Sequence, residues 1–390
     1  MENIEVRDLA CAFQLLRTIG ARRCCFRGRL TEDALEVEGS DGQRSIVVSL
    51  AVEGTDPKAL GTFDAVKPRT IKKAFMTTAR FGQRYSSGDR GSFEVIQDVN
   101  RAGRVFWKYS YGDVCYQLAF QRSAQSIMQP PSEDGVVWRL PTRDIGAALK
   151  AVSSAMPSPS DGSGPAYRQS LMYHNKLFFW PGENAGFVWR PAAIDERLPK
   201  KMFFQKPILV SLVDVLRQQV VTELSAWDRE QGALLRVGNA WVAGPAASLP
   251  NWPQREEEFA RELLQPADPV GWVRRVDLVN ALPPLKIVAP ERGRKIVFRR
   301  RGERNAILRA EGHPQCKFVE VTFEGQVKDL PDALEFECGA LADWVKTTIG
   351  PRLNISVRQD GSDVLLIVRE GGQLAYCRAR LLTDVPEADA

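Results

Sequence analysis

The stretch that decides the fold is Val6-Arg7-Asp8-Leu9-Ala10-Cys11-Ala12-Phe13, because its outline returns twice along the chain. The two returns are Thr142-Arg143-Asp144-Ile145-Gly146-Ala147-Ala148-Leu149 and Arg275-Val276-Asp277-Leu278-Val279-Asn280-Ala281-Leu282. All three place apolar residues at helical spacing, and they lie roughly 130 residues apart. A second helix-like segment follows each of them, beginning near Ala65, Phe203 and Glu335. The repeat predicts three similar units of two helices and antiparallel strands, which suggests a ring or an array more than a single catalytic cleft.

The repeat also predicts the domain boundaries. We expect units at 1–136, 137–262 and 263–382, with a small, polar, acidic tail at 383–390 that is disordered. Turn signals such as Gly238-Asn239 and Gly371-Gly372 separate alternating segments and predict tight hairpins. The helix that opens the third unit is expected to end at Pro283-Pro284, since proline removes a backbone donor. The sequence therefore predicts an α+β protein.

Composition narrows the class of protein only slightly. The formal net charge of +5 and the pI of about 8.8 are compatible with a polyanionic partner, although dispersed surface Lys and Arg explain them equally well. The seven cysteines form no CxxC motif and no legible disulfide framework. Together with the lack of a signal peptide, this favours a reducing cytoplasm. Apolar stretches such as 208–216 are too short to span a bilayer, so no membrane association is expected.

Motifs that carry chemistry are missing from the sequence. It contains no P-loop, GxGxxG, HExxH or GxSxG pattern. The two histidines, His174 and His313, stand in turn-like contexts, where a histidine is usually solvated. The acidic run Glu256-Glu257-Glu258 is expected to be a solvated surface run, and the tryptophans are expected in the core. We predict no catalytic residue, no metal and no cofactor, and hence a protein that is not an enzyme.

Beyond the repeat, the sequence resembles the bacterial DNA polymerase III beta subunit, the beta sliding clamp, as a divergent member. The segment Leu249-Pro250-Asn251-Trp252 looks like the Phe-Pro-Asp-Tyr segment that closes the second clamp domain. The pair Arg380-Leu381 looks like the Arg-Leu that ends the clamp, and residues 334–349 look like its last helix. The similarity covers nearly the whole chain, and the order of the segments carries it more than any one motif.

The resemblance implies three tandem clamp-type domains and a function without chemistry. Two chains would close head to tail into a ring, as a homodimer, with helices inside and sheets outside. Such a ring is a processivity factor in DNA replication, since it encircles double-stranded DNA and tethers a DNA polymerase. The polymerase and the clamp loader would bind through short peptide motifs.

The resemblance also implies that basic residues of the inner helices contact phosphates. For any one of them, a solvated helix face is an equally good explanation. The predicted DNA-binding residues are Arg17, Arg22, Arg23, Lys72, Lys73, Arg80, Lys150, Lys200, Lys201, Arg217, Arg274, Arg275 and Lys346.

Two further sites follow from the resemblance. The partner-peptide pocket would draw on Pro250, Gln254, Arg255, Leu374, Tyr376, Cys377, Arg378, Arg380 and Leu381. The dimer interface would use Cys115, Tyr116, Leu118, Ile287 and Val288.

The sequence departs from the family at the pocket. Residues 182–187 stand where the family has Asp-Gly-His-Arg-Leu, and Cys377-Arg378-Ala379 replaces an apolar Met-Pro-Met. An added charge weakens apolar anchoring, so we expect an altered partner peptide, as in a divergent phage or mobile-element replisome or with a dedicated repair polymerase. Two other interpretations stay open. One is a clamp-like scaffold or inhibitor of replication that is not loaded as a ring, and the other is an unrelated enzyme or nucleic-acid binder.

Overall fold

The computed structural model describes most of the chain, and the ranges are 3–20, 24–74, 88–112, 114–129, 132–143, 145–157, 165–198, 200–218, 221–229, 232–244, 252–289, 294–313 and 315–382. Two compact units account for these residues. Unit 1 comprises Met1–Arg143, Asp195–Leu198 and Pro207–Ala247, and unit 2 comprises Asp144–Ile194, Pro199–Lys206 and Ser248–Ala390. The predicted tail at 383–390 lies outside the described residues.

Unit 1 is built on one antiparallel sheet, which has thirteen strands within the described residues. In spatial order the strands are β1 (Ile4–Glu5), β6 (Arg90–Gln97), β7 (Arg104–Tyr111), β8 (Val114–Arg122), β5 (Gly61–Ala65), β2 (Cys25–Leu30), β3 (Ala34–Ser40), β4 (Ser45–Ala51), β17 (Ala240–Ala243), β16 (Gly232–Val237), β15 (Glu223–Arg229), β9 (Val136–Pro141) and β13 (Asp195–Glu196). Their alternating pattern explains the sheet, since β3 buries every second residue.

The helices of unit 1 pack on this sheet through the apolar stripes that the sequence displays. In α1 (Val6–Leu16), the side chains of Leu9, Phe13 and Leu16 are buried. The backbone of β3 approaches this helix closely, because a Cβ at Gly39 would lie 3.0 Å from Leu16 Cδ2. Residues 68–74 are helical, and α4 (Lys206–Gln218) begins where β14 (Met202–Gln205) of unit 2 ends.

Unit 2 is built on a second antiparallel sheet, with twelve strands in the described part of the chain. In order they are β14 (Met202–Gln205), β10 (Ser170–His174), β11 (Leu177–Pro181), β12 (Ala185–Trp189), β25 (Gln373–Leu381), β22 (Ala333–Glu337), β19 (Lys295–Arg301), β20 (Asn305–His313), β21 (Cys316–Gln326), β18 (Gly271–Arg274), β23 (Arg352–Asp360) and β24 (Asp363–Glu370), and β24 also pairs with β25.

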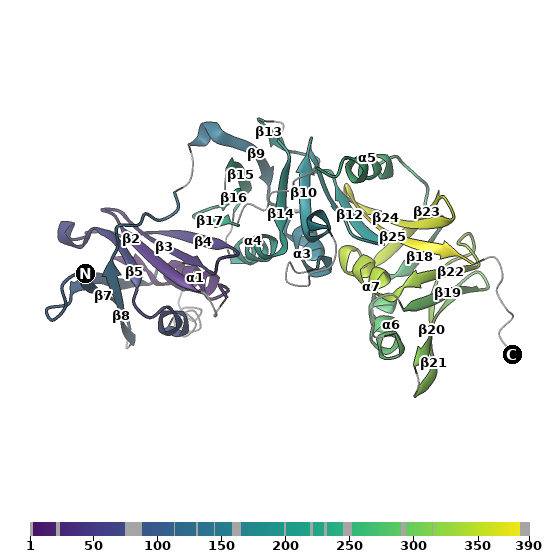
Figure 1. Ribbon diagram of the computed structural model, residues 1–390, viewed down its shortest axis with the longest axis horizontal. Coiled ribbons are helices and arrows are strands. Elements are labelled where there is room, and N and C mark those ends of the chain that lie inside the picture. Colours follow the sequence, from purple (N-terminus) through teal and green to yellow (C-terminus); the bar gives the residue numbers. More distant parts are fainter. Residues whose placement is uncertain are drawn as a thin grey trace. The chain divides into compact units, whose positions relative to one another are not determined.

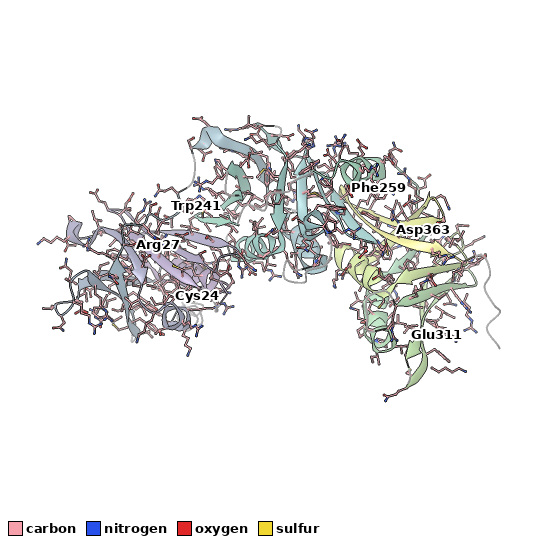
Figure 2. All side chains as sticks on the ribbon, viewed as in Figure 1. Cys24, Arg27, Trp241, Phe259, Glu311 and Asp363 are labelled. Atoms are coloured by element: carbon pink, nitrogen blue, oxygen red, sulfur yellow. The ribbon has the colours of Figure 1, made fainter. Side chains whose placement is uncertain are left out.

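Strands β24 and β25 separate two helical layers in unit 2. Leu366 and Cys377 belong to a core cluster with α6 (Arg275–Val288) and α7 (Cys338–Thr347). The alternate residues Leu365 and Tyr376 belong to another cluster, with α5 (Gln254–Leu263). Because successive strand residues point to opposite faces, α5 lies on one side of these strands and α6 and α7 on the other. Figure 1 shows this layering, and Phe259 marks α5 in Figure 2. The remaining helix, α3 (Ile145–Ala155), packs against α7.

The predicted hairpin turns are confirmed. Gly238 has φ 59° in the two-residue connection between β16 and β17, where Val237 pairs with Ala240. Gly371 and Gly372 have φ 54° and 80° between β24 and β25. Positive φ at both central residues, as at Gly371-Gly372, suits a type I′ turn, and positive φ at the first alone, as at Gly238, suits a type II′ turn.

Two predictions about helices are wrong. The helix α6 does not end at Pro283-Pro284 but continues through both prolines to Val288. The carbonyls that lose a donor belong to Val279 and Asn280, which are exposed residues, so water can satisfy them. The acidic run at 256–258 is also not simply a solvated surface run, because it lies within α5 and Glu257 is buried.

The division of the chain into three repeat units stays a prediction. Each sheet continues across a predicted boundary, because β4 pairs with β17 in unit 1 and β12 pairs with β25 in unit 2. The mixture of helices and antiparallel sheets confirms the α+β class.

Candidate functional site

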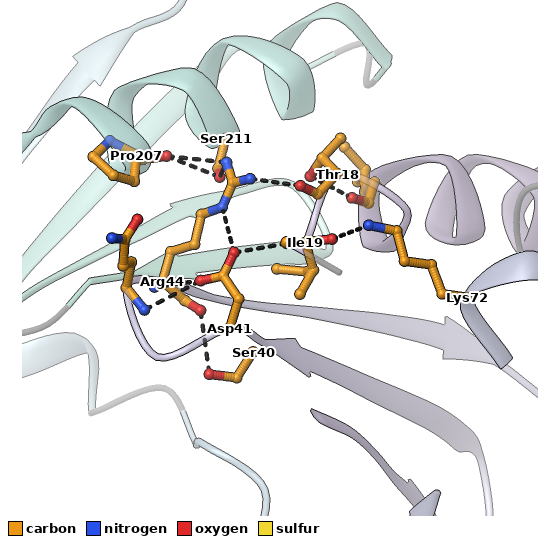
Figure 3. A network of polar contacts seen from close by, with 11 residues as sticks. Thr18, Ile19, Ser40, Asp41, Arg44, Lys72, Pro207 and Ser211 are labelled. Atoms are coloured by element: carbon orange, nitrogen blue, oxygen red, sulfur yellow. Dashed lines mark hydrogen bonds and ion pairs between the residues drawn. The ribbon is translucent and has the colours of Figure 1, made fainter. Parts of the chain in front are cut away.

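A polar network in unit 1 ties the ends of its helices together (Figure 3). Arg44, in the β3–β4 turn, donates to Ser211 Oγ of α4 at 2.7 Å, to the Pro207 carbonyl at 3.3 Å and to the Thr18 carbonyl at 2.5 Å. Asp41 holds the same guanidinium at 3.4 Å and accepts from the Gly20 amide at 2.7 Å. Charged side chains therefore satisfy backbone groups where α1 ends, and α4 is fixed to the same point.

Lys72 belongs to this network rather than to an open surface. Its Nζ donates to the Ile19 carbonyl just beyond α1, which joins the helical residues 68–74 to that helix end. A cation beside the last carbonyls of a helix stabilises it. Lys72 was predicted to contact DNA, and the structure gives it a structural contact within the chain.

Three other predicted DNA-binding cations, in or directly before a helix, are paired with an aspartate of that helix. Arg217 lies 3.9 Å from Asp214, Arg274 lies 2.8 Å from Asp277, and Lys346 lies 2.9 Å from Asp343. Each pair is spaced by three residues, a spacing that brings side chains together on a helix. These aspartates reduce the net positive charge that the helices present, and their spacing is visible in the sequence.

The other predicted cations are scattered. Lys73, Lys150, Lys200 and Lys201 are exposed, whereas Arg17 and Arg275 are half-buried. Lys201 lies beside α5, where its Nζ is 5.2 Å from the centre of the Trp252 ring. Arg22, Arg23 and Arg80 lie outside the described residues. A further exposed cation, Lys286 in the last turn of α6, was not predicted, because the helix was expected to end before it at Pro283-Pro284.

A cavity in unit 2 collects several residues of the predicted peptide pocket. It has a volume of about 230 Å³ and lies where α5, β25 and the β11–β12 turn meet. Arg255, Tyr376 and Arg378 line it, together with Phe259 and Arg168. Tyr376 forms part of its floor and is 7% exposed. The phenol is held neutral, because burial raises its pKa above the ordinary value.

The remaining predicted pocket residues do not line this cavity. Leu374 and Cys377 are buried in two different core clusters, on opposite faces of β25. Gln254 points to its own helix and donates to Glu258 Oε1 at 3.0 Å. Arg380 and Leu381 are exposed at the end of β25. Pro250 lies outside the described residues.

A buried carboxylate anchors α5 next to this cavity. Glu257 accepts from Trp252 Nε1 at 2.6 Å and from Arg261 Nη2 at 2.7 Å, and it bonds His174 Nδ1 at 2.8 Å. Burial alone would raise the pKa of Glu257, but the bonds from Arg261, Trp252 and His174 outweigh burial and hold the pKa below its ordinary value. The expectation of a solvated His174 is wrong, because this residue ends β10 and its ring forms a hydrogen bond with Glu257. The sequence carries no signal for this long-range pair.

Two strands have backbone groups on one side that pair with no other strand among the described residues. In β8, residues 114–118 pair only with β7, since β5 pairs with residues 120–122 and the Val66 amide donates to the Ala119 carbonyl. In β21, residues 316–324 pair with β20 alone, since β18 pairs only with Gly325 and Gln326. Cys115 is exposed on the first edge, Tyr116 is half-buried there, and Ile287 at the end of α6 is 66% exposed. Leu118 and Val288 pack inside the chain instead, at 7% and 0% exposure.

Within the part of the chain that the structure describes, no group of three or more His, Cys, Asp or Glu side chains is arranged to hold a metal ion. Among the same residues, no helix combines the length and the apolar character that crossing a membrane requires.

Comparison of the sequence with protein-family models gives no match, and comparison with the curated proteins gives none either. Comparison of the structure is decisive for the fold. The DNA polymerase III beta subunit of Thermotoga maritima matches with a TM-score of 0.68 at 11% identity, over 98% of this chain and 99% of that one. The DNA polymerase sliding clamp of Pseudomonas aeruginosa matches with a TM-score of 0.70 at 12% identity, over 98% and 99%. The sliding clamp of Caulobacter crescentus matches with a TM-score of 0.67 at 12% identity, over 98% and 99%.

The chain therefore has the fold of a DNA sliding clamp. In particular, the fold is that of the DNA polymerase III beta subunit, along almost the full length of the chain and at an identity that fits a divergent sequence. The resemblance inferred from the repeat is confirmed.

Proposed function

We propose that this protein is a DNA sliding clamp, a processivity factor that encircles duplex DNA and tethers a polymerase or other replication or repair proteins. The observation that carries the proposal is the structural match to beta clamps over 98% of this chain. Fold alone does not define a function, so the sites must support it.

The open strand edges support a ring. An exposed strand edge invites pairing with another chain, and a head-to-tail contact that closes leaves no edge free. The edge of β8 in one chain and the edge of β21 in a second chain are suited to this contact. Ile287, 66% exposed, would add apolar area to it. In this proposal two chains form the ring as a homodimer.

Duplex DNA would contact the helices by weak, sequence-independent interactions with phosphates. Arg17, Lys73 and Lys150 remain candidates from the sequence prediction, and Lys286 joins them. Since several helix cations are paired with aspartates, the contacts would be few. The ring would then hold DNA mainly by topology, and it would act in the cytoplasm without a cofactor, with a clamp loader and polymerase as partners.

The same pairing of charges favours a second candidate function. A clamp-shaped scaffold or inhibitor of replication, which is not loaded on DNA, needs no inner positive surface. In such a protein, aspartates could neutralise Arg217, Arg274 and Lys346 without any loss of function.

Retention on DNA separates the two functions. The protein is incubated with a clamp loader or assembled on nicked circular plasmid, and bound protein is isolated by gel filtration before and after linearisation. A sliding clamp stays on the circle and leaves after linearisation. Equal retention on both forms, or on neither, contradicts the proposal.

Light scattering must also show a species of twice 43.5 kDa. Ile287→Asp should shift this species toward the monomer, whereas Val99→Asp, at another exposed position, should not.

A further inference from the structure

A basic cavity opens on the face of the unit 2 sheet that lies opposite α6 and α7. It has a volume of about 450 Å³, and β19 and β20 supply most of its lining. On these strands the alternate residues Phe298 and Leu308 belong to the core cluster with α6 and α7, so the lining side chains point the other way. This β19–β20 cavity is lined by Val297, Glu311 and the cations Arg294, Lys295, Arg299 and Arg309. Its lining therefore carries a net positive charge.

Arg299 is the cation of this cavity with the most capacity to bind another group. Its side chain is half-buried, and its Nε is buried with no hydrogen-bond partner among the described residues. A buried donor without an acceptor is costly, and an added carboxylate oxygen would satisfy it. Lys295 pairs with Glu335 at 2.5 Å, and Arg309 pairs with Glu311 at 2.5 Å. Because Lys295 is 56% and Glu311 61% exposed, solvent screens both pairs, and they can exchange partners.

The register of the sheet brings the end of β25 close to this cavity. The Leu382 amide donates to the Ala333 carbonyl of β22 at 3.2 Å, and Ala333 lies opposite Arg299 of β19. Since β22 lies between β25 and β19, Leu382 and Arg299 flank the same residue, about 10 Å apart at the usual spacing of strands. Five further residues can span about 17 Å, so position 387 is within reach of the Arg299 side chain.

The segment that follows Leu382 has the opposite charge. Residues 383–390 lie outside the described residues, and they include Asp384, Glu387 and Asp389 but no basic residue. A short tether gives such a segment an effective concentration on the order of millimolar, which an acidic partner in solution would have to exceed. Duplex DNA suits the cavity less well, because the proposed function places DNA at the helices, on the other face of this sheet.

We propose that the β19–β20 cavity binds the acidic segment 383–390 of the same chain. Guanidinium forks match carboxylates in two-point geometry, so Arg299 is the anchor, and Lys295 and Arg309 add charge around it. The bound segment neutralises the cavity and shields this face of unit 2 from other polyanions. This inference goes beyond the proposed function, which assigns nothing to this face.

The test uses a synthetic peptide with the sequence of residues 383–390 and two forms of the full-length protein. One is the wild type, and the other carries Asp384→Asn, Glu387→Gln and Asp389→Asn, which removes the charge of the segment and keeps its length. Ligand-observed NMR at low ionic strength measures the weak binding. We expect the triple variant to bind the peptide at least tenfold more tightly, because the wild-type segment occupies the cavity, and binding should weaken as salt rises. Equal affinities, or no binding to either form, would overturn the proposal.

Substitutions in the triple variant test the cavity itself. Arg299→Gln should weaken peptide binding about tenfold, since a charged hydrogen bond is lost. Glu311→Gln should strengthen it, because the lining loses a carboxylate and Arg309 is released from its closer partner, and a gain of affinity cannot come from misfolding. The matched control is Arg304→Gln, an exposed arginine between β19 and β20 that lines another cavity of unit 2. Unchanged affinity in Arg299→Gln, or an equal loss in the control, contradicts the proposal.

Competition with a single-stranded oligonucleotide of eight nucleotides separates carboxylates from phosphates. If the oligonucleotide binds the triple variant more tightly than the peptide does, and Arg299→Gln weakens both equally, the cavity is a phosphate site and the proposal falls. Weaker binding of the oligonucleotide supports the acidic segment as the occupant. None of these measurements requires a closed ring, so the clamp proposal can fail while this inference survives, and the reverse also holds.

Discussion

Tyr376 occupies the space that a side chain at position 186 would need. A Cβ at Gly186 would lie 2.4 Å from both Cζ and the hydroxyl oxygen of Tyr376. The two residues sit on the paired strands β12 and β25, directly opposite each other in the register. A glycine on β12 is thus what lets an aromatic ring form the floor of the cavity between α5 and β25.

Gly186→Ala should push the Tyr376 ring out of its place. The crowding is expected to cost about 2 kcal/mol in the free energy of unfolding, as overpacking of cores does, and to weaken binding of a partner peptide at this cavity. Chemical denaturation measures the first effect. The double variant Gly186→Ala, Tyr376→Leu removes the clash, so its loss of stability should be clearly less than the sum of the two single losses. Additive losses would show that the contact does not constrain the site.

Arg44→Met should loosen the link between α1 and α4. The Arg44 side chain is 13% exposed, and its removal leaves Asp41 without this cation and the Thr18 and Pro207 carbonyls without this donor. We expect a loss of about 3 kcal/mol in the free energy of unfolding, measured with urea. Arg101→Met is the control at an exposed position and should change stability by less than about 0.5 kcal/mol. If Arg44→Met changed the free energy of unfolding as little as Arg101→Met does, the structural role of Arg44 would be contradicted.

The anchor of α5 should weaken in acid. The folded-state pKa of Glu257 lies below its ordinary value of 4.5, so the contribution of this carboxylate is present in full above about pH 4.5. It is lost as the pH falls through the folded-state pKa. Glu257→Gln should be less stable than wild type at pH 7, and the difference should shrink toward acid. Hydrogen exchange in α5 at several pH values measures this, and a pH-independent difference would contradict it.

Reversal of two helix lysines should reduce DNA affinity without unfolding the protein. Lys150 and Lys286 are exposed, and no ion pair of theirs is found among the described residues. For Lys150→Glu with Lys286→Glu, the slope of log affinity against log salt should become shallower by about 2, since each lost phosphate contact removes about 0.9. Lys58→Glu, an exposed lysine outside the main helices, is the control. An unchanged slope in the double variant would remove these residues from the DNA surface. Lys72 is unsuitable for such a test, because its reversal would also break the contact with Ile19.

Local patterns were sufficient to predict much of the architecture. The stripe of Leu9, Phe13 and Leu16 identifies α1, and the glycine turn at 371–372 identifies the hairpin of β24 and β25. Helical and strand periods are properties of consecutive residues, so they are readable without a partner. The same holds for the pairs of Arg217, Arg274 and Lys346 with aspartates three residues away.

The sequence by itself therefore determined the repeat, the α+β class and the residues that could carry positive charge. Only the tertiary structure decided which of those residues are engaged in contacts within the chain. It directs Lys72 to the end of α1, buries Glu257 against His174 and places Arg168, Arg255 and Arg378 around one cavity. The physical reason is that hydrogen bonds and ion pairs are short-ranged and join residues far apart in the chain. His174 and Glu257 are 83 positions apart, and no local pattern reports that distance.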